Sequence, residues 1–194
     1  MNKFYLVGIP GCGKTTLGKR VAECLNMPFF DTDKMAKNKL GDVSYTDMFK
    51  LFLHGHFSRE EKNAVIEVAG YDEPAIVATG AEVGLVKESV EIMKSTGYII
   101  HIKRETQSIL NEMEGKPSIG FVLVDRNNEN GEKPVSMQKL AVIEYAKCLA
   151  EYEMAADLNF SNYGSEDEGV EKLALLIQMI MESETEKTVP LPPA

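Results

Sequence analysis

The sequence is poor in positive charge and in cysteine, and it lacks any apolar run of membrane-spanning length. Its 21 Lys and Arg residues stand against 30 Asp and Glu residues, which gives a formal net charge of −9. Because an acidic protein repels the phosphates of nucleic acids, this balance argues against a nucleic-acid partner. The missing apolar run argues in the same way against a membrane partner. Any bound nucleotide must therefore be held by a local site and not by a general positive field.

The three cysteines, Cys12, Cys24 and Cys148, do not have the spacing of metal ligands. An odd cysteine count, with a strand-like run directly at the N-terminus, predicts reduced thiols and a cytoplasmic protein without a targeting segment. The chain contains no internal repeat and no interdomain linker, and its 194 residues suffice for one domain with a sizeable core. We expect this single domain to cover residues 1–182 and the protein to be a monomer.

Strand-like and helical patterns alternate along the chain. Short apolar runs predict strands at residues 4–7, 28–30, 75–79, 98–102 and 157–160. Helical periodicity is found at residues 14–25, 34–39, 45–53, 59–69, 83–95, 106–114, 136–155 and 168–182. Strands that alternate with helices predict a three-layer α/β fold, in which a parallel sheet has helices on both faces. In such sheets, ligands bind beyond the carboxyl ends of the strands.

The stretch GIPGCGKTTLG, residues 8–18, lies between the first predicted strand and the first predicted helix. It fits the P-loop pattern G-x-x-x-x-G-K-[ST], in which backbone N–H groups, a lysine and a hydroxyl surround phosphates and Mg²⁺. An ordinary glycine turn is the alternative. The predicted nucleotide-binding residues are Gly8, Pro10, Gly11, Cys12, Gly13, Lys14, Thr15 and Thr16. We expect Lys14 to be catalytic and to lie at a solvent-facing edge.

Two aspartates close the second predicted strand in the stretch FFDTD, residues 29–33. Asp31 and Asp33 are two residues apart, so a chain that leaves the strand can direct both carboxylates into one cleft. One carboxylate can hold Mg²⁺, and the other can orient or deprotonate a hydroxyl group. A helix cap without a catalytic role is the alternative interpretation of Asp33.

Two segments depart from the alternating pattern. Residues 115–135 mix glycine, proline and asparagine and carry Lys116, Arg126 and Lys133, which is typical of a mobile lid. The proline-rich tail, residues 183–194, is expected to be loose. Elsewhere, His54 and His56 form a possible metal pair without an evident third ligand. Exposed helix-end histidines are the alternative.

Several stretches together resemble the shikimate kinase family. Besides the P-loop, they are Phe29–Asp33 for F-x-D-x-D, Gly41, residues 55–59 for G-E-x-x-F-R, Thr79-Gly80 for T-G-G-G, and residues 150–157 for P-L-Y-x-x-x-A-D. The resemblance covers residues 1 to about 160. It implies a P-loop kinase fold with five parallel strands, ATP on the P-loop, and transfer of the γ-phosphoryl group to a ring hydroxyl, with shikimate as the leading acceptor.

The resemblance also implies roles for individual residues. Thr15 and Asp31 would hold Mg²⁺, and Asp33 would bind the acceptor hydroxyl and favour its deprotonation. Arg59 would pair with the carboxylate of the acceptor, a geometry that suits a planar guanidinium group. Gly80 would let the acceptor approach the backbone.

The part of the family pattern that binds the acceptor is matched incompletely. Arg59 is displaced by one residue, the triple glycine has become Gly80-Ala81-Glu82, and Cys148 stands where a second substrate arginine is expected, with Lys147 beside it. Glu82 would bring a negative charge to the substrate turn, so the pocket is expected to suit an anion poorly. Two alternatives stay open: a kinase for another small hydroxyl compound, and a nucleotide-binding regulatory protein that has lost transfer.

Overall fold

The computed structural model describes residues 2–41, 56–114, 122–123 and 135–188. Five parallel strands form its central sheet in the order β2-β3-β1-β4-β7. Their bounds are β1 Lys3–Val7, β2 Phe29–Asp31, β3 Ala75–Ala78, β4 Gly97–Lys103 and β7 Leu158–Ser161. This confirms the predicted parallel sheet. Strand β1 lies at its centre, where Tyr5 pairs with Val77 on one side and with Ile99 on the other.

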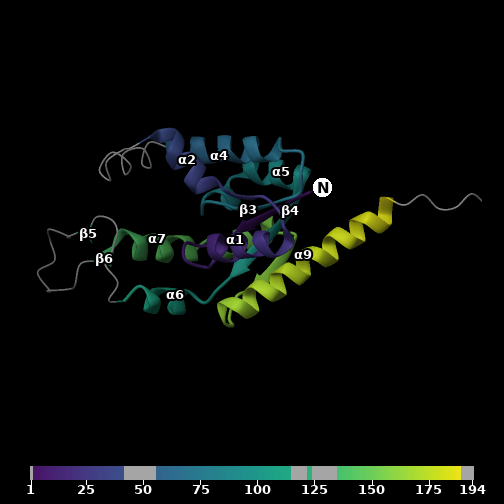
Figure 1. Ribbon diagram of the computed structural model, residues 1–194. Helices are drawn as coiled ribbons and strands as arrows, with labels where there is room; N and C mark the ends of the chain where they lie inside the picture. The colour runs from purple at the N-terminus through teal and green to yellow at the C-terminus, as the bar shows by residue number, and fades with distance from the viewer. Residues whose placement is uncertain (1, 42–55, 115–121, 124–134, 189–194) are drawn as a thin grey trace, which may run out of the picture.

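Helices cover both faces of this sheet (Figure 1). On one face, α1 (Lys14–Leu25) packs against β3 and against α9 (Glu166–Thr188). On the other face, α5 (Lys87–Thr96) and α8 (Leu149–Ala155) contact β4, and α4 (His56–Ala69) lies between α5 and α2 (Thr32–Leu40). The three-layer α/β fold is therefore confirmed, and right-handed crossovers account for the placement of the helices.

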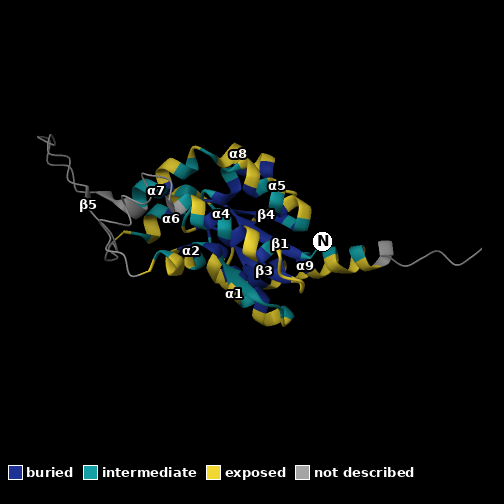
Figure 2. Ribbon diagram, turned by 90° about the horizontal axis from the view of Figure 1, so that it is seen from above, coloured by how far each residue is buried: buried dark blue, intermediate teal, exposed yellow. Residues whose placement is uncertain are grey.

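The hydrophobic core lies on the two faces of β1, β3 and β4, which are buried along most of their length (Figure 2). Helix α1 approaches the sheet closely at Gly18, where a Cβ atom would lie 3.0 Å from the side chains of both Leu6 and Phe29. A larger residue at this position would push α1 away from the strand that precedes it. Because the P-loop joins β1 to α1, this packing fixes both of its ends.

The remaining elements are α6 (Thr106–Glu112), a short antiparallel pair of β5 (Val122–Leu123) and β6 (Val135–Ser136), and α7 (Met137–Ala146). They contact one another: α6 packs against α7, which contacts β6, the second strand of the pair. The predicted lid, residues 115–135, falls almost entirely outside the described residues, as do its three cations and the predicted helix at 45–53. The lid stays a prediction.

Two predicted helices are each broken in two. The segment 83–95 is a 3₁₀ turn, η1 (Val83–Leu85), followed by extended Val86 and then α5. Gly84 explains the turn, because a Cβ atom there would lie 3.1 Å from both Val7 and Tyr152. The segment 136–155 divides into α7 and α8, because the N–H groups of Lys147 and Cys148 bond to carbonyls three residues earlier and so tighten the chain.

Helix α9 is longer than predicted. It begins at Glu166 and continues to Thr188, so the first six residues of the tail expected to be loose are helical. Residues 189–194 lie outside the described part of the chain. No helix among the described residues is both long and apolar enough to cross a lipid bilayer.

Candidate functional site

The P-loop connects β1 to α1 and curls at three glycines with positive φ angles. These are Gly8 at 141°, Gly11 at 79° and Gly13 at 107°. At Gly8 a Cβ atom would lie 2.8 Å from the carbonyl oxygen of Ile102, so the loop packs against β4 in a way that only glycine allows. Helix α1 begins directly after Gly13, and its free N–H groups and its dipole therefore face the loop.

Lys14 is buried, which corrects the expectation that it lies at a solvent-facing edge. Its side chain is 9% exposed. The Nζ atom donates hydrogen bonds to the carbonyl oxygens of Gly8, at 2.7 Å, and Ile9, at 3.1 Å. A buried ammonium group needs such acceptors, and the curled loop supplies them. The positive charge thus lies inside the loop, where phosphate oxygens would be held.

Thr15 and Asp31 meet at the carboxyl edge of the sheet. The Thr15 hydroxyl donates to Oδ2 of Asp31 at 2.9 Å, and the backbone N–H of Lys34 donates to Oδ1 at 3.0 Å. Asp31 is therefore the N-cap of α2, a role that the sequence had suggested for Asp33. The cap holds the Asp31 carboxylate in a fixed position beside the P-loop hydroxyl.

Asp33 lies two residues further on, in the first turn of α2. Its carboxylate forms an ion pair with Lys37, four residues later on the same helix. Both groups are about half exposed, so the pair contributes little to stability. Asp33 and Asp31 line the same cavity, as their spacing predicts.

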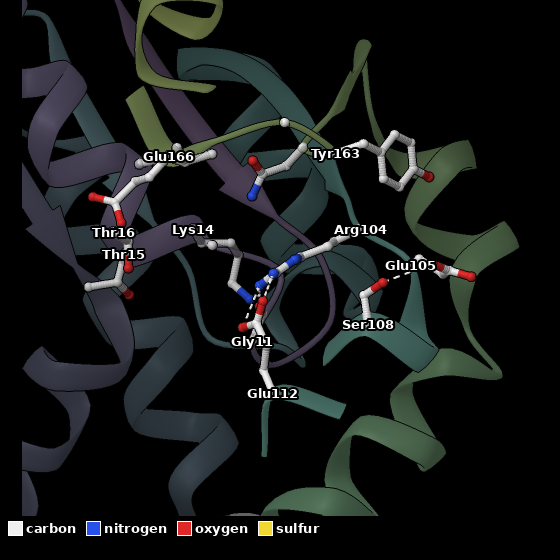
Figure 3. A pocket seen from close by; sticks show the side chains of 14 residues that line it. Gly11, Lys14, Thr15, Thr16, Arg104, Glu105, Ser108, Glu112, Tyr163 and Glu166 are labelled. Carbon is white, nitrogen blue, oxygen red and sulfur yellow. Dashed lines mark hydrogen bonds and ion pairs between the residues drawn. The ribbon is translucent and has the colours of Figure 1, made fainter. Parts of the chain in front are cut away.

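Two cavities meet at the P-loop. The nucleotide-side cavity, of about 720 Å³, lies between the P-loop, α6 and the segment after β7 (Figure 3). The acceptor-side cavity, of about 330 Å³, lies between the P-loop, α2, α4 and the turn after β3. Gly11, Lys14 and Thr15 line both. Of the other predicted residues, Gly13 and Thr16 line the nucleotide side and Pro10 the acceptor side, whereas Cys12 is buried beneath the loop.

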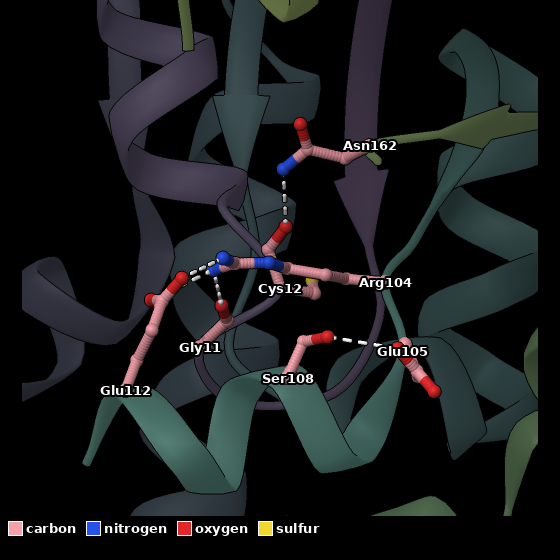
Figure 4. Close-up of polar contacts among 7 residues, drawn as sticks. All are labelled: Gly11, Cys12, Arg104, Glu105, Ser108, Glu112 and Asn162. Atoms are coloured by element: carbon pink, nitrogen blue, oxygen red, sulfur yellow. Dashed lines mark hydrogen bonds and ion pairs between the residues drawn. The ribbon is translucent and has the colours of Figure 1, made fainter. Parts of the chain in front are cut away.

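Two side chains tie the outer surface of the P-loop to the rest of the nucleotide-side cavity (Figure 4). Arg104 donates to the carbonyl oxygen of Gly11 at 3.3 Å and forms an ion pair with Glu112 of α6. The amide of Asn162 donates to the carbonyl oxygen of Cys12 at 2.9 Å. The motif search missed both residues. They follow β4 and β7 directly, so their place at the carboxyl edge of the sheet was the available signal.

Glu61 forms part of the floor of the acceptor-side cavity and was also missed. Its side chain, on α4, is 3% exposed. It lies over Gly80, where a Cβ atom would be only 1.5 Å from Glu61 Oε1. Gly80 therefore makes room for this carboxyl group. Burial above all, and then the negative charges of Asp33 and Glu82, raise the pKa of Glu61 to about 8.

Glu82 also lines the acceptor-side cavity and accepts a hydrogen bond from a neutral hydroxyl group. The hydroxyl of Ser58, on α4, donates to Oε2 of Glu82. The phenol of Tyr145, on α7, lines the same cavity, and its pKa is raised, chiefly by burial and next by the charge of Glu82. Among the described residues, no cation forms an ion pair with Glu82, and its carboxylate faces the cavity.

The structure does not bring the predicted carboxylate-binding cations into this cavity. Arg59 is exposed on α4 and is not among the described residues that line it. Cys148, at the position expected for a second arginine, caps α8, and Lys147 forms an ion pair with Glu144. The described residues include no group of three potential His, Cys, Asp or Glu metal ligands, and His54 lies outside them.

Sequence comparison identifies relatives of this chain. A family model described as shikimate kinase matches residues 10–174. The shikimate kinase of Clostridium beijerinckii is 31% identical over 114 residues, which cover 58% of this chain and 65% of that protein. That of Thermoanaerobacter pseudethanolicus is 31% identical over 129 residues, which cover 66% of this chain and 74% of that protein. The match to the first relative thus spans just under two thirds of its length.

Solved structures share the fold. A shikimate kinase from Acinetobacter baumannii, in complex with shikimate, has a TM-score of 0.71 at 20% identity and covers 95% of this chain and 94% of its own. A gluconokinase from Sinorhizobium meliloti has a TM-score of 0.67 at 12% identity, with coverages of 97% and 98%. At these identities the likeness concerns the fold alone.

Proposed function

Since this chain belongs to the shikimate kinase family, we propose that it transfers the γ-phosphoryl group of ATP to a hydroxyl group of a small organic acceptor. The observation that carries this proposal is that Lys14 and Thr15 line both cavities. A phosphate chain that enters from the nucleotide side would present its terminal group to the acceptor side at these two residues. Catalysis of such a transfer consists mainly of positioning and charge neutralisation.

On the donor side, the backbone N–H groups of the P-loop and of the first turn of α1 would hold the phosphates of ATP. Lys14 would exchange the carbonyl oxygens of Gly8 and Ile9 for phosphate oxygens, since its Nζ atom already lies inside the loop. From there its charge opposes the negative charge on the γ-phosphoryl group during transfer. Arg104 stands at the wall of the same cavity and fixes the carbonyl of Gly11 away from the phosphates.

Thr15 and Asp31 would hold Mg²⁺. Their side-chain oxygens lie 2.9 Å apart, and hydroxyl and carboxylate oxygens are the ligands that Mg²⁺ prefers together with phosphates and water. When bound, Mg²⁺ neutralises charge on the β- and γ-phosphates. The N-cap bond from Lys34 keeps the Asp31 carboxylate directed toward the P-loop.

Asp33 would orient the acceptor hydroxyl and take up its proton. The hydroxyl oxygen forms a bond to the γ-phosphorus, the bond from that phosphorus to the bridging oxygen breaks, and ADP leaves. The proton of the hydroxyl passes to the Asp33 carboxylate. Lys37, four residues later on α2, forms an ion pair with this carboxylate.

Family membership makes shikimate the first candidate acceptor. The Acinetobacter baumannii protein that shares the fold is described in complex with shikimate. A kinase for another small hydroxyl compound is the second candidate. The specific observation in its favour is the carboxyl-rich acceptor-side cavity, into which none of the predicted carboxylate-binding cations projects among the described residues.

An ADP-release assay tests the proposal. The protein is incubated with Mg²⁺ and ATP, alone and with shikimate and a panel of hydroxyl compounds, and the acceptor-free reaction is the blank. We expect release of ADP that depends on one acceptor and that falls by about a hundredfold in Asp33→Asn. Nucleotide binding without any acceptor-dependent turnover would instead identify a regulatory protein that has lost transfer.

A further inference from the structure

The acceptor-side cavity has an unbalanced set of charges. Among the described residues, four carboxyl groups and one ammonium group line it: Asp31, Asp33, Glu61, Glu82 and Lys14. The proposed transfer reaction uses three of these groups. Asp31 serves the metal, Asp33 the acceptor hydroxyl and Lys14 the phosphates. Glu61 and Glu82 are left without a part in the chemistry, although both face the space that the acceptor must occupy.

Glu61 is the buried carboxyl group of this cavity. It is almost fully buried and lies against Gly80. Within the described parts of the chain, no group donates a hydrogen bond to its carboxyl oxygens. A buried carboxyl group without a donor is costly, and its neighbours here, Asp33 and Glu82, increase the cost because both are negative. A cation placed against Glu61 would remove that cost.

Glu82, from the turn after β3, also favours a cation in the cavity. The neutral hydroxyl of Ser58 binds its carboxylate, the phenol of Tyr145 faces it across the cavity, and its charge stays in the cavity. The turn after β3 thus presents a negative side chain beside Gly80. A carboxylate on the acceptor would be repelled by the charge of Glu82 and would keep Glu61 protonated, whereas an ammonium group would be attracted to Glu82 and would favour the ionised form of Glu61.

We propose, on the basis of the proposed kinase function, that the acceptor carries a positive charge: it is a small hydroxylated amine whose ammonium group binds between Glu61 and Glu82 while Asp33 holds its hydroxyl. The cavity volume of about 330 Å³ suits a compound of this size. The described cations near the cavity do not replace such a ligand, because Lys37 pairs with Asp33 and Arg59 is exposed on α4.

An acceptor screen in three charge classes tests this inference. ADP release is measured with hydroxylated carboxylates (shikimate, gluconate), neutral polyols (glucose, inositol) and hydroxylated amines (glucosamine, aminocyclitols). We expect turnover with an amine, at a kcat/KM at least tenfold above that of any neutral or carboxylated acceptor. A preference for a carboxylated or neutral acceptor would overturn the inference and leave the kinase function standing. Acceptor-independent ADP release alone would overturn the kinase function itself.

Two variants and a matched control test whether Glu61 and Glu82 bind the ammonium group of the acceptor. In Glu61→Gln and Glu82→Gln, the KM for the amine should rise at least tenfold, far more than kcat falls, and the KM for ATP should not change. Glu171→Gln, an exposed carboxylate on α9, is the control and should match the wild type. Thermal unfolding confirms that each variant is folded. Glu82 is only partly buried, so Glu82→Gln remains informative should Glu61→Gln unfold. An unchanged KM for the amine in the folded variants would overturn the inference.

Discussion

The two cavities on either side of the P-loop are built from different parts of the chain. The nucleotide side joins the curled glycines and the start of α1 to side chains of α6 and of the segments after β4 and β7, among them an arginine whose charge is matched by Glu112. The acceptor side is formed mainly by side chains from α2, α4, α7 and the turn after β3, and among the described residues its carboxyl groups outnumber its cations. Backbone recognition of phosphate needs the same few residue types in any kinase of this fold, whereas side-chain recognition can change with the acceptor.

Lys14→Ala should have the largest effect, because Lys14 belongs to both cavities. Loss of one preorganised donor to the transferred phosphoryl group costs about 3–4 kcal/mol of barrier, by analogy with oxyanion donors. We therefore expect kcat to fall by about three orders of magnitude. Steady-state kinetics measure this, and thermal unfolding checks that the buried site tolerates the change. Turnover equal to that of the wild type would contradict the assignment of the P-loop.

The free energy of unfolding should depend on pH through Glu61, which belongs to the acceptor-side cavity. Burial first, and then the negative charges of Asp33 and Glu82, raise the pKa of Glu61 from 4.5 to about 8, although Lys37 and Lys14 also face it and act in the opposite direction. Between pH 5 and 8 the folded protein therefore keeps a proton that the unfolded chain releases. Stability without ligand should fall as the pH rises through this window, by about 3 kcal/mol from this group.

Glu61→Gln should remove this contribution to the slope of the unfolding free energy against pH. Urea unfolding at pH 5 and pH 8 compares the variant with the wild type, and Glu171→Gln should keep the wild-type slope. The same slope in Glu61→Gln and in the wild type would show that Glu61 titrates normally in the folded protein.

Asp33→Asn should separate acceptor chemistry from nucleotide binding. An asparagine keeps the size of the side chain but cannot take up the proton of the hydroxyl group, and general-base catalysis contributes about 10²–10⁴-fold. We expect kcat to fall by about a hundredfold while the Kd for ATP changes little, which calorimetry measures. If the variant instead needed more Mg²⁺ and turned over normally, Asp33 and Asp31 would have exchanged roles.

Glu82→Gly should have the smallest of these effects. It removes one negative charge from the acceptor-side cavity and so tests whether that charge weakens the binding of an anionic acceptor. A carboxylate 4 Å from Glu82 is repelled by about 1 kcal/mol in water and about 4 kcal/mol at the effective dielectric of a protein surface. The KM for shikimate should therefore fall by about tenfold or more, with the KM for ATP unchanged. A wild-type KM for shikimate in the usual range of enzymes, unimproved by the change, would mean that the carboxylate is held by another route.

The sequence predicted the parts of the molecule that depend on local patterns. The five strands are apolar runs, and the P-loop conformation follows from Gly8, Gly11 and Gly13 within six residues. Asp31 and Asp33 could be assigned to one cavity because a strand end and a spacing of two residues place them there.

The rest depends on contacts between distant segments. Glu61 has an ordinary position on an amphipathic helix, and only its packing against Gly80 buries it in the cavity. Tyr145 comes to Glu82 because α7 ends at Ala146, a break that helical periodicity does not reveal. Lys14 seemed exposed because the motif does not show where its ammonium group finds acceptors.

The bond from the Asn162 amide to the carbonyl of Cys12 joins residues 150 positions apart. During synthesis at about 5–20 residues per second, the P-loop is made roughly 8–30 s before the residue that holds it from outside. The segment after β7 can reach Cys12 only once β7 has paired with β4, so the last strand of the sheet must be in place. The loop that is made first is therefore completed last, and a partly synthesised chain is unable to present the finished nucleotide site.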